Sequence, residues 1–307
     1  MESIRIFSPA TVANVGCGFD VLGFCLDHVG DEMTITKIPD KTIRISGVEG
    51  YDLPTEVKSN VAGISALAMY DELNLDHGFE IYIKKGIMPG SGIGSSAASA
   101  VGSVFGMNEL IQRPFSKHDL LRFAVEGESF ASQAKHADNL APALLGGFTL
   151  VRDLDPIDVL QIPSPKDLYA VIIHPKIEIK TSDARSVLPA EIELPKAIRQ
   201  WANVGALVHG LHTSDYDLIK RSLEDVVIEP HRKSLIPLYE DAKLKAMEAG
   251  ALGCNISGSG PSIFALCQGE VNAQAIEKVW QELYENSGIA FETFYSQAGA
   301  QGARIIL

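Results

Sequence analysis

The stretch Gly86-Ile-Met-Pro-Gly-Ser-Gly-Ile-Gly-Ser-Ser-Ala-Ala-Ser-Ala-Val-Gly102 combines more glycine, serine and alanine than any other window of the chain. An alternation of apolar and polar residues typical of a strand precedes it at 79–85, and a run of small and apolar residues compatible with a helix follows at 96–111. The order is therefore strand, glycine loop, helix N-terminus. Backbone N–H groups at a helix N-terminus attract anions, and glycine lets a ligand approach the backbone closely. The stretch predicts a loop that binds the phosphates of a nucleotide.

Three other interpretations of this loop are a plain turn, a Walker A loop and a dinucleotide-binding loop. A flexible glycine-serine turn explains it without any ligand, since short motifs also arise by chance. A Walker A loop requires a lysine after its last glycine, and here Ser95 follows Gly94, so that interpretation fails. A dinucleotide-binding pattern, Gly-x-Gly-x-x-Ala, is present at Gly92, Gly94 and Ala97. However, the preceding strand is not apolar throughout and no acidic strand end follows at the usual distance, so we interpret this match as accidental.

The composition is that of a globular protein, and 307 residues are enough for two domains. The net charge of −13 argues against broad binding to nucleic acid or anionic membranes, although it does not exclude an anionic nucleotide in a local pocket. The four cysteines form no Cys-x-x-Cys pair, and the sequence shows neither an N-terminal signal segment nor a transmembrane run. We expect reduced thiols and a cytoplasmic location, with no nucleic-acid partner and no membrane partner.

Strand and helix patterns divide the chain into two parts. The Asp- and Pro-rich segment 153–165 indicates an edge or a linker, so the predicted domains are 1–160 and 161–307. In the first part, Ser8-Pro9 is expected to end a short strand, and Ser59 or Asn60 is expected to cap a helix. In the second part we expect helices at 195–213, 215–226, 235–249 and 272–287, and strands at 169–174, 252–257, 262–267, 291–297 and 303–307, which together predict an α+β sandwich.

Three polar residues stand out from their small or apolar surroundings. Asn14 and Asp20 are the strongly polar positions of segment 10–24, and turn chemistry and ligand contact explain them equally well. Glu128 lies among Gly127, Ser129 and Ala131, small residues that allow close backbone approach and favour an inward side chain. Because Mg²⁺ prefers oxygen ligands and usually keeps water and phosphate in its shell, Glu128 and one serine hydroxyl would suffice to hold it.

Three ordered stretches, which together span nearly the whole chain, resemble the motifs of the GHMP family of small-molecule kinases. They are PATVANVGCGFD at 9–20, PGSGIGSSAA at 89–98 and SGSGPS at 257–262. Each motif alone is weak, but the ordered set is specific. The resemblance implies an α+β fold of two domains, with an N-terminal ATP-binding domain that is ribosomal-S5-domain-2-like and a C-terminal ferredoxin-like α/β sandwich.

Within this family the chain is most similar to the kinases that phosphorylate L-homoserine. The resemblance rests on the Asn-x-Gly-x-Gly-Phe-Asp form of the first motif and on KHADNLAP at 135–142, TSDAR at 181–185 and IEPHR at 228–232. It implies ATP-dependent phosphorylation of the homoserine hydroxyl to O-phospho-L-homoserine in threonine biosynthesis, with Mg²⁺ and a homodimer. A GHMP kinase acting on a different small-molecule alcohol and a non-catalytic binding protein of the same fold are the alternatives.

The resemblance also implies roles for individual residues. Asn14 would orient the hydroxyl and act in catalysis with Glu128, and no dedicated catalytic base is evident. Glu128 would hold the metal with Ser96, or with Ser95 in its place. The residues expected to bind substrate are Asn14, Asp20 and Asp138 (ammonium), Arg185 and Arg232 (carboxylate), and Gly260. The residues expected to bind ATP are Asn60 and Lys85 toward the nucleoside, and Pro89, Gly90, Ser91, Gly92, Ile93, Gly94, Ser95 and Ser96 at the phosphates.

Overall fold

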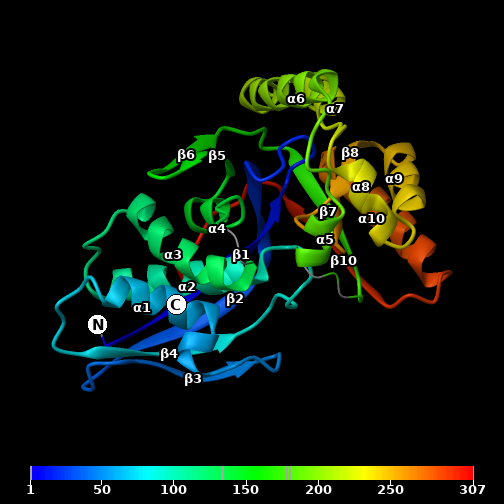
Figure 1. Cartoon of the computed structure of the whole chain (residues 1–307). Helices are drawn as coiled ribbons and strands as arrows, with labels where there is room; N and C mark the ends of the chain where they lie inside the picture. Colours follow the sequence, from blue (N-terminus) through cyan, green and yellow to red (C-terminus); the bar gives the residue numbers. More distant parts are fainter. Residues whose placement is uncertain (1, 133–134, 178, 180, 307) are drawn as a thin grey trace.

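The described residues of a computed structural model, 2–132, 135–177, 179 and 181–306, form two sheets with helices packed on them (Figure 1). The first is a seven-stranded sheet in which strands run in the order β11-β1-β2-β4-β3, while β5 pairs with β2 and β6 with β5. Its strands are β1 (Ser3–Ala13), β2 (Leu22–Ile38), β3 (Ile43–Glu49), β4 (Gly78–Lys84), β5 (Phe148–Leu154), β6 (Ile157–Ile162) and β11 (Arg304–Ile306).

The helices of the first half pack against this sheet and against one another. The helix predicted after the glycine loop is confirmed as α2, and its small residues let it lie directly on β1 and β2. A Cβ added at Gly102 would lie 2.7 Å from Met33 Sδ, so glycine at this position leaves room for the Met33 side chain. The elements are η1 (Val57–Ser59), α1 (Val61–Tyr70), α2 (Ser95–Leu110), α3 (Lys117–Ser132) and α4 (Leu140–Leu145).

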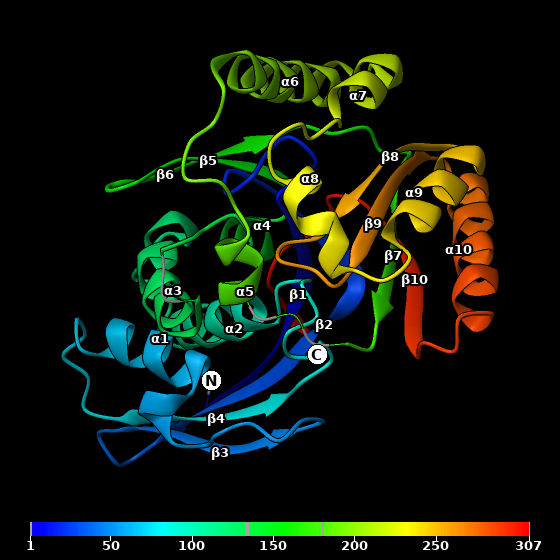
Figure 2. The ribbon, with the colours of Figure 1, turned by 45° about the vertical axis from the view of Figure 1, so that its right-hand side comes forward.

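The second sheet has four strands among the described residues, in the order β10-β7-β9-β8. Helices α9 and α10 cover its outer face, where Trp280 and Tyr284 are fully buried (Figure 2). Its strands are β7 (Leu168–Pro175), β8 (Ala251–Ile256), β9 (Ile263–Gln268) and β10 (Phe291–Gln297). The helical elements of this half are α5 (Thr181–Ser186), α6 (Leu194–Thr213), α7 (Tyr216–Ser222), α8 (Glu229–Arg232), η2 (Lys233–Leu235), α9 (Tyr239–Glu248) and α10 (Glu270–Glu285).

A shared hydrophobic core joins the two halves. Phe24 of β2 stacks on Phe148 of β5 at 4.7 Å between ring centroids and meets Phe264 of β9 edge-on at 5.9 Å. These rings belong to one buried cluster that contains residues of both sheets. Burial of large aromatic side chains across this boundary favours a fixed relative position of the two sheets.

Several sequence-based expectations need correction. Ser8-Pro9 does not end the first strand, because β1 continues to Ala13 with a register shift between Pro9 and Thr11 that accommodates the missing proline N–H. The segment 153–165 is not a linker over its whole length, since it contains the β5–β6 turn and the edge strand β6. The helix expected at 215–226 ends at Ser222, and the helix expected at 235–249 begins at Tyr239. The domain boundary near residue 160 stays a prediction.

Candidate active site

A cavity of about 350 Å³ is lined by residues from both halves of the chain. The glycine loop after β4 lines one part of it, and Arg185 of α5 and Arg232 of α8 line another part. Its lining includes most of the residues that the sequence motifs singled out: Asn14, Asp20, Asn60, Lys85, Pro89, Gly90, Ser91, Gly92, Gly94, Ser95, Ser96, Glu128, Asp138, Arg185 and Arg232. Long-range folding therefore brings the separate motifs to one site.

The glycine loop has the backbone geometry that its sequence predicts. Gly90, Gly92 and Gly94 have φ angles of 73°, 81° and 73°, in the left-handed region that favours glycine. Gly94 is the N-cap of α2, and no described side chain caps this helix. The N–H groups of the first turn of α2 thus remain available for an anion, and the cavity extends over Ser95 and Ser96 at this helix end.

The second glycine cluster, at 257–262, holds the loop in place from the other half of the protein. Ser257 Oγ donates to Gly92 O at 2.7 Å, and Ser262 Oγ donates to Ser91 O at 2.5 Å. Gly258 and Ser259 of this cluster also line the cavity. Gly260, an expected substrate ligand, packs behind the loop instead, where a Cβ on Gly92 would lie 2.6 Å from Gly260 O.

Two residues predicted to bind ATP have their side chains engaged within the protein. Ile93 is buried in the core shared by the two halves, so only its backbone is suited to a phosphate contact. Lys85 forms a buried ion pair with Asp31 and donates to Ser95 O at 2.9 Å and Ser99 Oγ at 3.0 Å. Its ammonium is thus bonded beneath the start of α2, a position that the sequence did not predict.

Asp31 completes this buried network. Its second carboxylate oxygen accepts hydrogen bonds from the backbone N–H groups of Gly86 (3.1 Å) and Ile87 (3.3 Å) at the beginning of the loop. Burial raises the pKa of Asp31 and lowers the pKa of Lys85, and the attraction between the two groups opposes both effects. Sequence reasoning missed Asp31, which lies 54 residues from Lys85 within a long alternating strand.

Glu128 and Ser96 lie together at the loop side of the cavity. Gly127 lets α3 approach α1, since a Cβ there would lie 2.6 Å from Val61 O, and the next residue then faces the cavity. Burial raises the pKa of Glu128, and a hydrogen bond from Ser96 acts in the opposite direction. The Ser95 hydroxyl instead donates to Ile87 O at 3.0 Å. The geometry therefore favours Ser96 over Ser95 as a companion of Glu128.

Asn60 combines a structural position with exposure to the cavity. Its side-chain oxygen accepts from Ala62 N at 2.9 Å, which confirms Asn60 as the N-cap of α1. Its amide nitrogen donates to Pro54 O at 2.7 Å. The neighbouring Leu53, Pro54 and Val61 also line the cavity, so this end of the site is mainly apolar.

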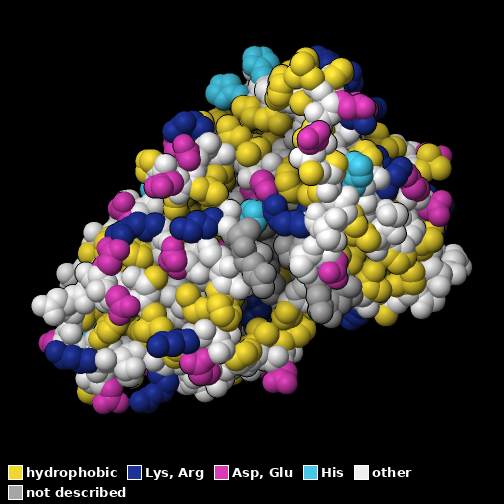
Figure 3. Space-filling model, viewed as in Figure 1, with side chains coloured by type: hydrophobic (Ala, Val, Ile, Leu, Met, Phe, Trp, Pro, Cys, Tyr) yellow, Lys and Arg dark blue, Asp and Glu magenta, His cyan; other side chains and the backbone are white. Residues whose placement is uncertain are grey.

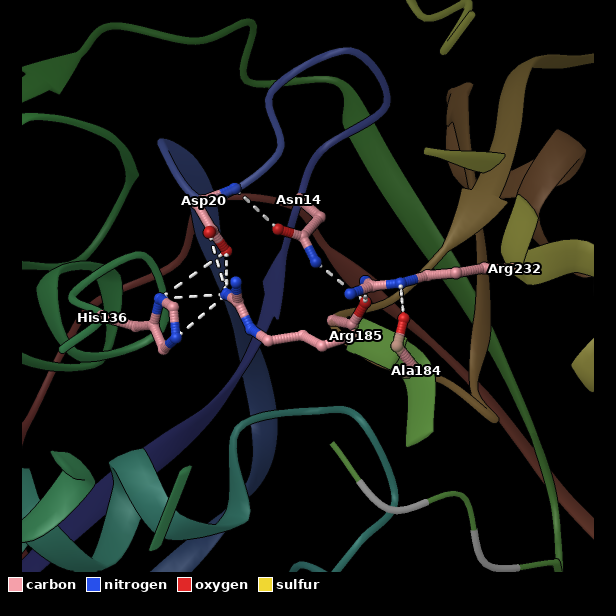
Figure 4. Close-up of polar contacts among 7 residues, drawn as sticks. Asn14, Asp20, His136, Ala184, Arg185 and Arg232 are labelled. Carbon is pink, nitrogen blue, oxygen red and sulfur yellow. Dashed lines mark hydrogen bonds and ion pairs between the residues drawn. The ribbon is translucent and has the colours of Figure 1, made fainter. Parts of the chain in front are cut away.

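A charged group occupies the opposite end of the site (Figure 4). Arg185 Nη2 donates to both carboxylate oxygens of Asp20, at 2.9 and 2.8 Å, and lies 3.0 Å from His136 Nε2. Burial lowers the pKa of His136 and the carboxylate of Asp20 opposes this, which leaves the imidazole neutral near pH 7. His136 was missed as a site residue, although the stretch 135–142 that carried the resemblance contains it.

Asn14 and Arg232 meet at one backbone carbonyl, Gly258 O. Asn14 Nδ2 donates to it at 2.8 Å and Arg232 Nη1 at 3.1 Å, while Arg232 Nε donates to Ala184 O at 2.9 Å (Figure 4). Asn14 Oδ1 accepts from Asp20 N at 2.8 Å, and both residues have φ angles of 60°. The turn role is confirmed for Asn14 and Asp20, and their ligand role stays a prediction.

Asp138 lies close to both ends of the site. Its side chain is buried, and its pKa is raised to about 7 because of burial and the nearby charges of Asp20 and Glu128. A carboxylate with this pKa changes its charge near neutral pH, so it is sensitive to a cation bound beside it.

Comparison with known proteins agrees with this architecture. The GHMP kinases N terminal domain matches residues 60–147, and the GHMP kinases C terminal domain matches residues 206–286. The homoserine kinase of Chlorobium phaeobacteroides (strain BS1) is 43% identical over 321 aligned residues, which cover 100% of each protein. The chain belongs to the homoserine kinase family. The family also includes the homoserine kinase of Xylella fastidiosa (strain M12), which is 37% identical over 98% of this chain and 94% of its own length.

Solved structures support membership of the homoserine kinase family. The crystal structure of homoserine kinase from Cytophaga hutchinsonii has a TM-score of 0.96 and 47% identity, and covers 100% of this chain and 98% of its own. The L. major mevalonate kinase in complex with R-mevalonate has a TM-score of 0.71 over 96% of each chain but only 16% identity, so it shows the shared fold alone. The predicted GHMP kinase fold is thereby confirmed.

Proposed function

We propose that this protein catalyses the ATP-dependent phosphorylation of L-homoserine to O-phospho-L-homoserine, a step of threonine biosynthesis. One observation carries the proposal: a single cavity joins an uncapped helix N-terminus suited to phosphates with a cluster of acidic and basic groups suited to an amino acid. Homoserine supplies an ammonium, a carboxylate and a hydroxyl, and each of these groups would meet a chemically matching partner in the cavity. The assignment also agrees with the family to which the chain belongs.

The phosphate end of the site would act mainly through positioning and charge stabilisation. The N–H groups of the glycine loop and the first turn of α2 would hold the ATP phosphates, and the apolar region around Asn60 would receive the nucleoside. The loop has no lysine of its own after Gly94. Its backbone is held by hydrogen bonds from Ser257 and Ser262 on one side and by the Asp31–Lys85 pair beneath it.

The residues around Glu128 fit Mg²⁺. Glu128 and Ser96 offer a carboxylate and a hydroxyl oxygen, and burial of the carboxylate raises its pKa, as expected for an anionic group that a cation would stabilise. When bound with ATP, Mg²⁺ neutralises negative charge on the phosphates. Glu128 and Ser96 would hold it at the loop end of the cavity.

At the substrate end, ion pairs to homoserine would replace ion pairs that the protein makes within itself. Asp20 and Arg185 neutralise each other in the structure, and each keeps about a third of its side-chain surface exposed. Asp20 and Asp138 would bind the ammonium, and Arg185 and Arg232 the carboxylate. Arg232 is suited to this role because its described hydrogen bonds go only to the neutral carbonyls of Ala184 and Gly258, so none of them goes to a carboxylate.

The hydroxyl would be oriented by Asn14 toward the phosphate end of the cavity. The Asn14 amide already bonds to Asp20 N and Gly258 O, so it is held rigidly between the first motif and the third. Phosphoryl transfer in a loose transition state needs orientation of the attacking oxygen more than early removal of its proton. The proposal therefore assigns no dedicated catalytic base.

The homodimer and the cytoplasmic location expected from the sequence belong to the same proposal. Large apolar side chains are exposed on and just before α6, at the upper end of the face in Figure 3: Ile192, Leu194, Ile198 and Trp201. A second copy would remove such a surface from water. Light scattering after gel filtration tests whether the protein is a dimer.

The four buried free cysteines are compatible with a reducing compartment. Among the described residues, no helix is long and apolar enough to cross a membrane.

A coupled assay of ADP release with several alcohols tests the function. We expect release that depends on homoserine, and a phosphate monoester of homoserine detected by ³¹P NMR. Two analogues separate the recognition elements: γ-hydroxybutyrate lacks the ammonium, and aminopropanol lacks the carboxylate. Both should be poor substrates, since the site would then keep an unpaired buried charge. Faster turnover of mevalonate or galactose than of homoserine would contradict the proposal in favour of another GHMP kinase activity.

A further inference from the structure

Gln200, on the inner side of α6, connects two segments that bear substrate-site residues. Its amide nitrogen donates to Cys17 O at 3.0 Å and to Asp225 Oδ1 at 2.8 Å. Its amide oxygen accepts from Val226 N at 3.0 Å. Cys17 belongs to the loop between Asn14 and Asp20, and 225–226 precede α8, the short helix that ends in Arg232.

Asp225 organises the start of that short helix. Its Oδ1 accepts from the backbone N–H groups of Val227 and Ile228, and its Oδ2 accepts from Glu229 N, each at 2.9 Å. Helix α8 has four residues, too few to be stable through its own hydrogen bonds. The position of Arg232 at its end therefore depends on contacts such as those of Asp225.

The loop at 14–20 also depends on external support. It leaves and rejoins its strands through residues with left-handed φ angles, Asn14 and Asp20. A Cβ at Gly16 would lie 2.6 Å from Leu223 O, so the loop lies directly on the segment after α7. The guanidinium of Arg232 lies 5.0 Å from the centroid of the Phe19 ring. A change in the spacing of the two segments would therefore alter a contact within the site.

We propose that Gln200 and Asp225 are positioning residues that set the spacing between the Asn14–Asp20 loop and Arg232, and thereby the affinity for the amino-acid substrate. Gln200 and Asp225 do not line the cavity, whereas Asn14, Asp20 and Arg232 do. Among the described residues, their side-chain hydrogen bonds reach the loop at Cys17 and the segment 225–229, and none reaches the glycine loop. The inference rests on the proposed function, because it assigns these residues to the homoserine end of the site and not to the ATP end.

The test uses the variants Gln200→Ala, Asp225→Ala and Asp225→Asn in the full chain. The matched controls are Arg199→Ala and Glu224→Ala, which remove the adjacent exposed ion pair (2.8 Å, side chains 60% and 54% exposed) from the same two segments. The readouts are kcat, the KM for homoserine, the KM for ATP and the melting temperature. Gln200→Glu adds a charge beside Asp225, so it should weaken homoserine binding more than Gln200→Ala while keeping a side chain of the same shape.

We expect Gln200→Ala to raise the KM for homoserine by about tenfold and to leave the KM for ATP within about twofold, as for loss of hydrogen bonds to a charged acceptor. The double variant Gln200→Ala/Asp225→Ala should be less than additive in kcat/KM for homoserine, because both residues act through one network. Asp225→Asn, which keeps an acceptor oxygen, should recover part of the loss seen in Asp225→Ala. The controls should match the wild type.

Equal changes in both KM values, or effects no larger than those of the controls, would overturn the inference. If Asp225→Ala does not fold, Gln200→Glu and Asp225→Asn give the same comparison. Wild-type enzyme that releases no ADP with homoserine would overturn the proposed function. Wild-type activity together with an unchanged homoserine KM in the Gln200 variants would overturn only the positioning role.

Discussion

The ammonium of Lys85 donates a hydrogen bond to the carboxylate of Asp31. The two groups form an ion pair buried beneath the glycine loop, with 1% of the Lys85 side chain and 0% of the Asp31 side chain exposed. The pair joins the end of β4 to β2, and the same two side chains bond to the loop backbone at Gly86 and Ile87 and to Ser95 at the start of α2. The conformation of the glycine loop is therefore supported by a buried ion pair. Lys84, the neighbouring lysine, lies on the solvated face, with 56% of its side chain exposed.

Loss of one partner of this pair should destabilise the fold strongly. Lys85→Met leaves the Asp31 charge unpaired in the interior, so we expect the free energy of unfolding to fall by about 3–5 kcal/mol. The control Lys84→Met should cost about 0–1 kcal/mol, as is usual for an exposed pair. Urea denaturation followed by circular dichroism measures both values. Equal losses in the two variants would show that the buried pair has no special contribution.

Glu128→Gln should raise the Mg²⁺ concentration needed for half-maximal activity by about tenfold or more, since a neutral amide is a poorer ligand than a carboxylate. Glu126→Gln is the matched control: it lies on the same helix, its side chain is 53% exposed, and it faces Lys135 at 3.8 Å. Titration of activity with Mg²⁺ at saturating ATP and homoserine gives the comparison. An unchanged Mg²⁺ requirement in Glu128→Gln would remove this residue from the metal site.

Asn14→Ala should lower kcat by about a hundredfold or more, because misplacement of the attacking hydroxyl is costly in a positioning mechanism. The variant also loses the hydrogen bonds to Asp20 N and Gly258 O, so its melting temperature has to be measured alongside. Asn14→Asp serves as the second variant, since it keeps the acceptor for Asp20 N and tolerates the left-handed φ angle. Near-normal turnover of a folded Asn14→Ala protein would contradict the role of Asn14.

The activity should depend on pH through Asp138, whose pKa is raised to about 7 by burial and by the neighbouring acidic groups. Below this pKa the free enzyme carries a neutral Asp138, which attracts the homoserine ammonium less. We therefore expect kcat/KM for homoserine to fall by up to about tenfold per pH unit as the pH drops below 7. Asp138→Asn should lower the plateau and abolish this acidic limb. An acidic limb that persists unchanged in Asp138→Asn would assign it to another group.

Much of the phosphate end of the site was predictable from the sequence because it is local. Glycines at alternating positions before a helix specify left-handed backbone and an open helix N-terminus, whatever surrounds them. In the same way, Gly127 predicted the close approach of α3 that turns Glu128 inward. The cap at Asn60 and the helix after the loop followed from local patterns and are confirmed.

The substrate end was less predictable, because its contacts are made between distant segments. The sequence nominated Asp20 and Arg185 as separate ligands, and only the fold shows that they pair with each other across 165 residues. Asp31 and Gln200 carried no local signal, since a polar residue in a helix or strand is usually solvated, and His136 was contained in the stretch 135–142 without being singled out. Their importance appears only when the fold places a partner beside each of them.

The sequence by itself determined the order of the three motifs, the glycine loop with its following helix, and the family of the chain, since these depend on residue types at short spacing. Only the tertiary structure decided that the third motif clamps the loop through Ser257 and Ser262, and that Lys85 serves the core rather than the surface. Hydrogen bonds and ion pairs between distant segments form when burial of the shared core brings the two halves together. The proposed substrate site is a product of that packing, whereas the conformation of the glycine loop is a property of its own sequence.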